Sequence, residues 1–92
     1  MEIVWDEKKN QSNIKDHKVS FEEAQTVFYD PSAKVMHDPD HSCGEDRYII
    51  LGISKSMKLL VVCHCYREND VIIRIISARK ATKNESKHYG GK

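Results

Sequence analysis

The sequence lacks several features that would assign it to a class of protein at once. It has no apolar run of the roughly 18 residues that a membrane span needs, and its opening, MEIVWDEKK, does not contain the apolar core of a signal peptide. It also lacks internal repeats, a glycine-rich phosphate loop, a paired Cys-x-x-Cys motif and a nucleophile elbow. We therefore expect one cytoplasmic domain over residues 1–92, with no membrane contact.

Cysteine is scarce, and its three copies do not suggest a disulfide framework. Cys63 and Cys65 lie two apart in a predicted strand, so their side chains point to the same face without meeting as a disulfide. An odd count with this spacing indicates a reducing compartment. Cys43 lies with His37 and His41 in an acidic, turn-rich segment whose spacing matches no established zinc pattern. We therefore expect no metal ion and no other cofactor.

The formal net charge of +1 conceals an uneven distribution of charge. Residues 30–46 contain five acidic side chains and one basic, whereas residues 67–92 contain seven basic and three acidic. Such a separation favours a basic face for an anionic partner, of which nucleic acid is the commonest. A solvated charged surface would give the same composition.

The first half of the chain predicts one strand and two helices. EIVW at 2–5 is typical of a short first or edge strand, and the polar helix after it covers 8–17. A second helix begins with a capping box, in which Ser20 is the N-cap and Glu23 lies three residues on. Residues 29–46 are loop-like, although the AKVMH segment within them could form a short strand.

The second half predicts an antiparallel meander and a terminal helix. Three β-rich segments are separated by short turns, at 46–54, 58–67 and 70–79. Thr82 and Glu85 then form a second capping box for a short C-terminal helix. The order predicts an α+β fold, with two N-terminal helices packed on one face of an antiparallel sheet of three to four or more strands. The other face would remain open to a partner or a substrate.

Arginines interrupt the most apolar predicted strand. Strict alternation would put Arg74 on one face with Ala78, and Ser77 on the opposite face. The same rule would put Arg79 opposite Arg74, although its place at the strand end allows its side chain to reach either way. An arginine among apolar neighbours needs an anionic partner, which is either a neighbouring acidic side chain or a phosphate that matches its two parallel N–H groups.

Further polar residues have two interpretations each. Arg47 follows Glu45 and Asp46 directly, so the three could form an ion-pair cluster or an acid–base group with a stabilising charge. Lys9 on the polar helix belongs either to a solvated face or to a second basic wall that faces the sheet. His64 shares the side of its strand that carries Leu60, Val62 and Tyr66, which favours a packed residue over a catalyst.

Several separated blocks resemble the BrnT family, the toxin half of a bacterial type II toxin–antitoxin pair. IRIISARKAT at 73–82 resembles its most recognisable segment, and the other blocks occur in the family's order: WDEKK at 5–9, N…H.VSFEEA across 13–24 and EDRYIILG at 45–52. One departure is Asp16-His17-Lys18, where the family usually has Lys-His-Gly. The negative charge argues against RNA binding by this turn, and the missing glycine predicts a different turn.

The resemblance implies a RelE-like fold and a metal-independent ribonuclease that blocks translation, acting on RNA with or without the ribosome. Its partner would be a BrnA-type antitoxin with a ribbon-helix-helix region, in a hetero-oligomer that contacts operator DNA only through the antitoxin. Since RNA carries its own nucleophile, the 2′-hydroxyl, the protein must supply cations and proton transfer. The rival interpretation is a degenerate toxin that binds nucleic acid or protein without cleavage.

The residues divide into roles on this hypothesis. Arg74 and Arg79 clamp the phosphate and the transition state, with Arg47 in support. The candidates for proton transfer are Glu45, His17 and His64, in no order that the sequence decides. The remaining basic residues that we expect to bind RNA phosphates are Lys9, Arg67, Lys80 and Lys83.

Overall fold

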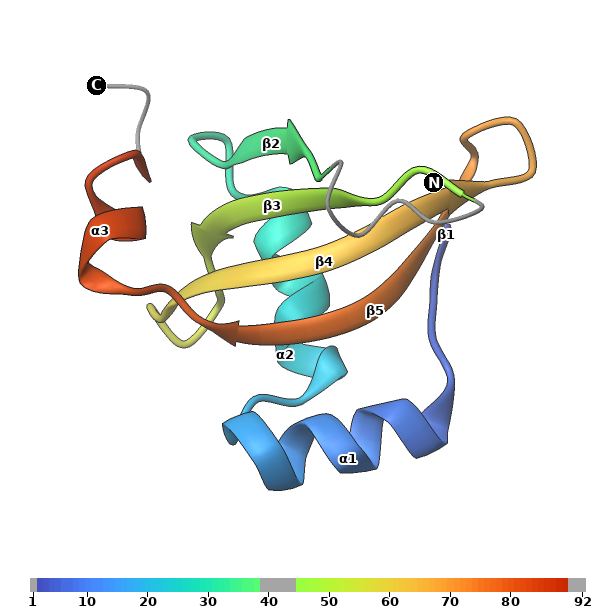
Figure 1. Ribbon diagram of the computed structural model, residues 1–92, viewed down its shortest axis with the longest axis horizontal. Coiled ribbons are helices and arrows are strands. Elements are labelled where there is room, and N and C mark those ends of the chain that lie inside the picture. The colour runs from blue at the N-terminus through green and yellow to red at the C-terminus, as the bar shows by residue number, and fades with distance from the viewer. Residues whose placement is uncertain (1, 39–44, 90–92) are drawn as a thin grey trace.

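The computed structural model describes residues 2–38 and 45–89. In chain order its elements are β1 (Glu2–Val4), α1 (Glu7–His17), α2 (Phe21–Ala24), the 3₁₀ helix η1 (Gln25–Tyr29), β2 (Lys34–His37), β3 (Tyr48–Ile53), β4 (Leu59–Arg67), β5 (Ile72–Lys80) and α3 (Lys83–Ser86) (Figure 1). The expected α+β arrangement is confirmed, including the short strand β2. No helix within the described ranges has the length and apolar character that crossing a bilayer requires.

The strands form a five-stranded sheet in the order β1-β5-β4-β3-β2. The pairs β2–β3, β3–β4 and β4–β5 are antiparallel, as predicted, but β1 pairs with β5 in parallel. The prediction of a wholly antiparallel sheet was therefore wrong at this edge. Tight turns fix the direction of β4 and β5, whereas nearly the whole chain separates β1 from β5 and leaves either direction open.

The hydrophobic core lies between the sheet and the segment formed by α2 and η1. Phe21, Ala24 and Val27 are fully buried there, and Leu60 and Val62 of β4 lie beneath them. The predicted N-cap sets the start of α2, since the Ser20 hydroxyl accepts a hydrogen bond from the Glu23 N–H at 3.1 Å. The predicted capping box is not completed, because the Glu23 carboxylate accepts from the Ser54 hydroxyl at 2.6 Å. The sequence predicted that helices cover one face of the sheet, and α2 and η1 lie on this one.

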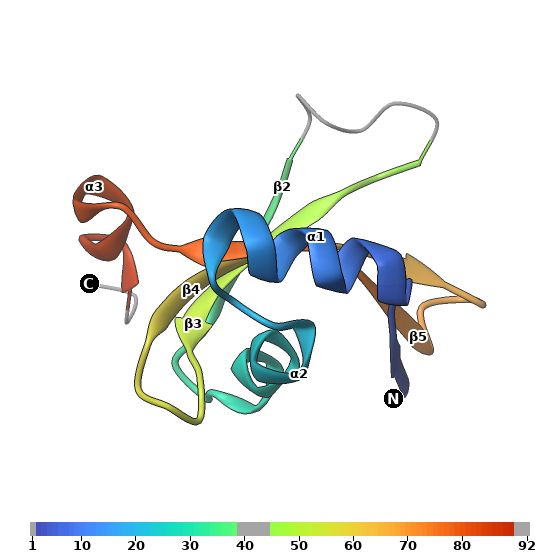
Figure 2. The ribbon, with the colours of Figure 1, turned by 90° about the horizontal axis from the view of Figure 1, so that it is seen from below.

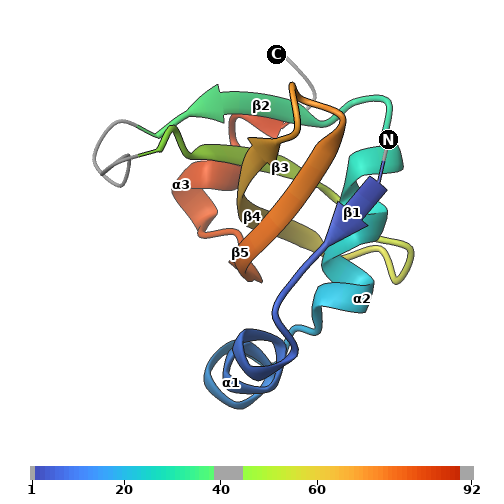
Figure 3. The same ribbon diagram turned by 90° about the vertical axis from the view of Figure 1, so that its right-hand side faces the viewer.

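Helix α1 does not cover that face in the way that was expected. It lies along the edge of β5, beyond the part of that strand that pairs with β1 (Figure 2 and Figure 3). The Asn13 side chain makes two hydrogen bonds to the Ala78 backbone, and Asn10 accepts one from the Phe21 N–H at 2.8 Å. Buried amides, rather than an apolar stripe, attach this polar helix to the fold.

The turn after α1 has the geometry that a glycine favours. Lys18 ends the helix with φ 61° and ψ 27°, in the left-handed region, and its N–H donates to the Ile14 carbonyl at 2.9 Å. The chain therefore forms a left-handed helix cap without a glycine, while a turn that differs from the family's stays a prediction.

An irregularity in β5 changes which side chains share a face. Cys63 pairs with Ser77 but His64 pairs with Ile75, so Ile76 is an extra residue in β5, a β-bulge. Before the bulge Ile75 is buried against the helices, and after it Ala78 is buried on the same side. The prediction from strict alternation, which placed Ala78 with Arg74 and Ser77 opposite Arg74, was wrong because the bulge reverses the phase between Arg74 and Ser77.

Candidate active site on the arginine face

All four arginines of the chain project from the face of the sheet opposite α2. Arg74 and Arg79 pair in register with Cys65 and Val61 of β4, and directly paired residues point to the same side. These β4 residues alternate with the buried core positions, and Arg67 continues their series. Because the bulge reverses the phase of β5, it brings Arg74 and Arg79 to one face. We call this surface, with Arg47, the arginine face.

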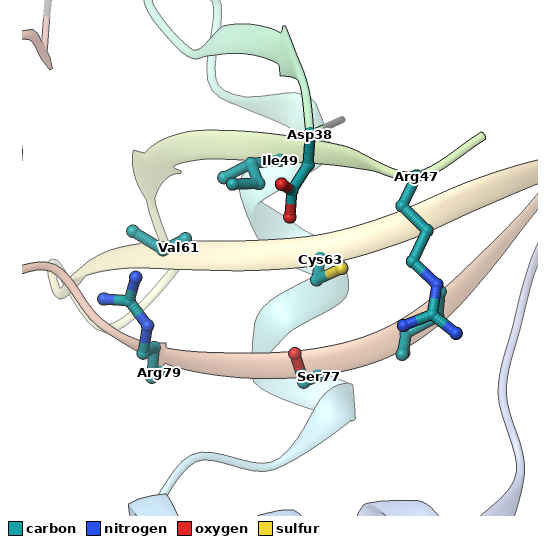
Figure 4. Close-up of a pocket in the computed structure, with 8 residues that line it drawn as sticks. Asp38, Arg47, Ile49, Val61, Cys63, Ser77 and Arg79 are labelled. Atoms are coloured by element: carbon teal, nitrogen blue, oxygen red, sulfur yellow. The ribbon is translucent and has the colours of Figure 1, made fainter. Parts of the chain in front are cut away.

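A groove of about 270 Å³ lies on the arginine face. Arg47 and Arg79 lie at its two ends, with Cys63 and Ser77 between them (Figure 4). Its remaining lining residues are Asp38, Ile49, Val61 and Ile76. We call this hollow the arginine groove. An apolar floor between two cations suits a ligand that combines a flat apolar group with an anion, as a nucleotide does.

A second hollow, of about 320 Å³, lies between α1 and β5. Lys9 and His17 of α1 line it together with Asp16, and Ile76 and Ser77 line both this hollow and the arginine groove. We call it the α1 groove. The two grooves therefore adjoin at the bulge, and a chain of successive phosphates could run from one to the other.

Arg79 is held by a carboxylate of the C-terminal helix. Its Nη1 and Nη2 donate to the two carboxylate oxygens of Glu85, each at 2.8 Å, and Nη1 lies 3.4 Å from the Lys80 carbonyl. The hydrogen bonds from Arg79 lower the pKa of Glu85 from 4.5 to about 2, and the same contact raises the pKa of Arg79. The pair is therefore ionised throughout the physiological range.

The other predicted basic residues lie outside the two grooves. Arg67 forms an ion pair with Glu45 at 3.2 Å. The sequence had suggested a cluster of Glu45 with Asp46 and Arg47, and the structure adds an arginine of β4 to it. Arg74 is partly buried between its register partners on β1 and β4. Lys80 is exposed and pairs with Leu60, which places it toward the opposite face, and Lys83 is exposed at the start of α3.

His64 lies on the opposite face of the sheet from the arginine groove. Its side chain is fully buried, and its ring lies edge-on to Phe28 with centroids 4.9 Å apart. Nδ1 donates to the Val62 carbonyl at 3.1 Å, and burial lowers the pKa of the imidazole. The packed interpretation is confirmed, and the structure does not bring this predicted catalytic residue to the arginines.

Asp38 is a groove residue that the sequence interpretation did not assign. It follows β2, and its N–H donates to the Arg47 carbonyl at 2.8 Å, which continues the pairing of β2 with β3. The sequence contained one signal for this position. Asp38 lies two residues after Met36 of the short strand predicted at 33–37, so its side chain points to the same face as Met36 if the strand continues. Because residues 29–46 were predicted to be loop-like, this signal was not used.

Two cysteines lie within the described ranges, and neither forms a disulfide. Burial raises the pKa of the Cys63 thiol at the floor of the arginine groove. Among the described residues, no three His, Cys, Asp or Glu side chains are arranged to hold a metal ion. His41 and Cys43, whose spacing was compared with zinc-binding patterns above, lie outside the described residues.

Comparisons with known proteins agree with this fold. A family model described as the ribonuclease toxin BrnT of type II toxin–antitoxin systems matches residues 5–85. The crystal structure of the Brucella abortus ribonuclease toxin BrnT resembles the chain with a TM-score of 0.68 and 26% identity, over 90% of this chain and 99% of that one. No curated protein sequence is significantly similar. Since the family model covers most of its length, the chain belongs to the BrnT family of ribonuclease toxins of type II toxin–antitoxin systems.

Proposed function

We propose that this chain cleaves RNA in the arginine groove without a metal ion. The observation that carries the proposal is the pair of guanidinium groups, Arg47 and Arg79, at the two ends of a groove with an apolar floor. RNA supplies its own nucleophile, the 2′-hydroxyl, so no metal-bound hydroxide is needed. The protein must stabilise the extra negative charge on phosphorus, and the two arginines provide donors for it, of which Arg79 is held in place by Glu85.

The α1 groove extends the site along the RNA. Lys9 and His17 line it, and it adjoins the arginine groove at Ile76 and Ser77. With the scissile phosphate at the arginines, Lys9 would bind a neighbouring phosphate. Arg74 and Arg67, on the same face beyond the groove, would attract the rest of the strand electrostatically. Lys83 at the start of α3 and Lys80, which is directed toward the opposite face, would add long-range attraction.

Proton transfer falls to His17 and Asp38 in this proposal. Among the three groups that the sequence offered, His17 lines a hollow that adjoins the arginines, whereas Glu45 pairs with Arg67 and His64 lies behind the sheet. Asp38 adds a carboxylate inside the groove itself. A carboxylate can accept the 2′-hydroxyl proton, and an imidazole can protonate the leaving 5′-oxygen.

The direct experiment is cleavage of an end-labelled single-stranded RNA by the purified chain in excess EDTA. We expect products that end in a 2′,3′-cyclic phosphate or a 3′-phosphate, and we expect Arg79→Ala to slow their formation by about 100-fold or more. Lys58→Ala, which removes an exposed lysine from the turn between β3 and β4, is the matched control. Cleavage that requires added Mg²⁺, or that survives Arg79→Ala unchanged, would contradict the proposal.

The wider role follows from the family. We propose a RelE-like toxin that inhibits translation in the cytoplasm, either on free RNA or on the ribosome. A BrnA-type antitoxin with a ribbon-helix-helix region would neutralise it in a hetero-oligomer and would make the contact with operator DNA. Expression of the chain alone should arrest growth, and co-expression with the antitoxin should relieve the arrest. Growth that continues during expression of a folded chain would count against a toxin.

One observation favours a second candidate, a module that binds RNA without cleavage. Asp16 lines the α1 groove, where its negative charge opposes a phosphate, and Glu85 already neutralises part of the charge of Arg79. Retained RNA binding with no product in the EDTA assay, both with and without ribosomes, would support this candidate. An increase in cleavage on Asp16→Lys would instead indicate an active but weakened ribonuclease.

A further inference from the structure

We infer that Glu85 is a positioning residue, which holds the guanidinium of Arg79 so that its remaining N–H groups face the RNA phosphate. The inference deepens the proposed function and rests on it, because Arg79 binds the scissile phosphate there. Glu85 itself would touch neither substrate nor reacting atoms. Its effect on cleavage would pass through Arg79.

The hydrogen bonds of Arg79 leave one parallel pair of its N–H groups available for a ligand. A guanidinium has five N–H groups, arranged as an end-on fork from Nη1 and Nη2 and a side-on fork from Nε and Nη2. Glu85 occupies the end-on fork at 2.8 Å for each bond, and the second Nη1 hydrogen lies toward the Lys80 carbonyl at 3.4 Å. The two N–H groups left over, on Nε and Nη2, are parallel, and such a pair matches two phosphate oxygens.

The carboxylate is itself fixed by the start of α3. Its Oε1 accepts a hydrogen bond from the Thr82 N–H at 2.8 Å, and the Thr82 hydroxyl accepts one from the Glu85 N–H at 3.1 Å. These bonds complete the capping box that the sequence predicted. Arg79 is therefore connected to a rigid turn on its own strand end, and the long side chain loses most of its rotational freedom before the substrate arrives.

The short length and exposure of α3 indicate that it serves Arg79 and not the hydrophobic core. The helix has four residues, Lys83–Ser86, and none of them is buried. A helix of this length is not stable alone, and this one contributes almost nothing to the core. Its capping box and its ion pair with Arg79 hold its first turn, and the Tyr89 hydroxyl just after the helix donates to the Asp30 carboxylate at 2.6 Å.

Glu85 could in principle compete with the phosphate for Arg79, and the geometry argues against this. Competition requires both anions to use the same N–H groups, whereas the end-on and side-on forks can be occupied together. The ion pair does reduce the attraction between Arg79 and a distant phosphate. Positioning should therefore appear as a change in kcat, and competition as a change in KM or in RNA affinity.

A double-mutant cycle on cleavage rates tests the inference. We expect Glu85→Gln, which cannot accept two bonds from the fork, to lower kcat by about 10-fold or more while KM changes by less than about 3-fold. In an Arg79→Ala background, Glu85→Gln should have no further effect. Ser86→Ala removes a hydroxyl that donates to the Lys83 carbonyl within α3 at 2.7 Å but leaves the capping box and the carboxylate in place, so it controls for loosening of α3 and should keep kcat.

Three outcomes would overturn the inference. An unchanged or increased kcat in Glu85→Gln would make Glu85 neutral or a competitor. An equal loss of activity in Ser86→Ala would reduce the role of Glu85 to the stability of α3. A further loss on adding Glu85→Gln to Arg79→Ala would show that it acts by another route.

A second measurement keeps the inference testable if the wild-type chain cleaves no RNA, a result that would contradict the proposed function alone. In ¹⁵N-resolved NMR spectra, the Arg79 Nε–H resonance should shift when an oligonucleotide with 2′-deoxy substitution is added. Glu85→Gln should broaden the resonance and reduce the shift. The same response in both chains would refute positioning.

Discussion

Asn13 and Ala78 lie 65 residues apart in the sequence and are joined by a single side-chain amide that imitates a neighbouring strand. The Asn13 Nδ2 donates to the Ala78 carbonyl at 2.8 Å, and its Oδ1 accepts from the Ala78 N–H at 3.0 Å. Nδ2 also donates to the Val19 carbonyl at 2.8 Å. One buried residue therefore satisfies the edge of β5, fixes the link to α2 and holds α1 beside the arginine groove.

Replacement of Asn13 should be costly for this reason. Asn13→Ala would leave three buried backbone groups without partners, and we expect a loss of about 3 kcal/mol in the free energy of unfolding. Asn13→Asp keeps the acceptor for the Ala78 N–H but loses both donors, so it should also destabilise the protein. Urea unfolding checks both variants, with Ser12→Ala on the exposed surface of the same helix as control. A loss below about 1 kcal/mol would show that water replaces the amide.

The contact also shows where sequence reasoning stops. The polar character of α1 was evident, and so was the prospect of a basic wall facing the sheet. However, nothing in the spacing of Asn13 and Ala78 indicates a hydrogen bond across the fold. A contact of this kind depends on how the chain closes, and the local pattern records only that Asn13 is polar.

The bulge at Ile76 is the second feature that the sequence did not predict. The strands, the hairpin turns and both helix N-caps follow from local chemistry, and the structure has them where they were expected, although only the capping box at Thr82 and Glu85 is complete among the described residues. One extra residue in β5 reverses the phase of every side chain after it, so strict alternation misplaced Ser77 and Ala78. The composition of the strand gave no sign of this, because a bulge is selected by the register of the partner strand and by packing on both faces.

Lys18 gives a prediction in the stabilising direction. Its φ of 61° is a conformation that glycine adopts without the steric cost that a Cβ adds. We expect Lys18→Gly to raise the free energy of unfolding by about 1 kcal/mol, in spite of the greater freedom that glycine gives the unfolded chain. Lys15→Gly, within the same helix, should lower it by a similar amount. Thermal unfolding of the two variants side by side measures the difference, and equal effects would contradict the left-handed cap.

The ion pair of Glu85 and Arg79 predicts a pH dependence of stability. The pKa of Glu85 falls from 4.5 to about 2 because of its hydrogen bonds to Arg79, so the folded chain holds this proton less tightly than the unfolded chain. The resulting stabilisation is fully present above pH 4.5 and is lost as the pH falls toward 2. Because a third of the Glu85 side chain is exposed, we expect about 1 kcal/mol after screening by solvent.

Unfolding of the wild-type chain and of Glu85→Gln at pH 7, 5, 4 and 3 isolates this effect, since other carboxylates titrate in both proteins. The difference between the two free energies of unfolding should be constant down to about pH 5 and should shrink below it. A difference that stays the same at pH 3 would mean that the ion pair contributes nothing to folding.

Gly52 tests the packing of η1 against β3. A Cβ at this position would lie 2.7 Å from the Val27 Cγ1 and 2.9 Å from the Ala33 Cβ, both closer than side chains approach. We expect Gly52→Ala to destabilise the fold by about 2 kcal/mol through overpacking. Adding Val27→Ala to Gly52→Ala should recover part of that loss, because it removes the nearest atom. If the two changes simply add, the strain does not arise at Val27.

Arg79→Lys separates charge from geometry at the candidate site. Lysine keeps the positive charge but offers a point charge on a flexible stem, so it can neither hold both oxygens of Glu85 nor present a parallel pair of N–H groups to a phosphate. We therefore expect a loss in kcat of about 10-fold or more, with RNA affinity reduced much less than in Arg79→Ala. The two variants should be compared in single-turnover cleavage and in binding to a 2′-deoxy-substituted oligonucleotide. A lysine variant that cleaves at the wild-type rate would show that a cation near the phosphate is sufficient, and that the fork which Glu85 leaves open has no part in the reaction.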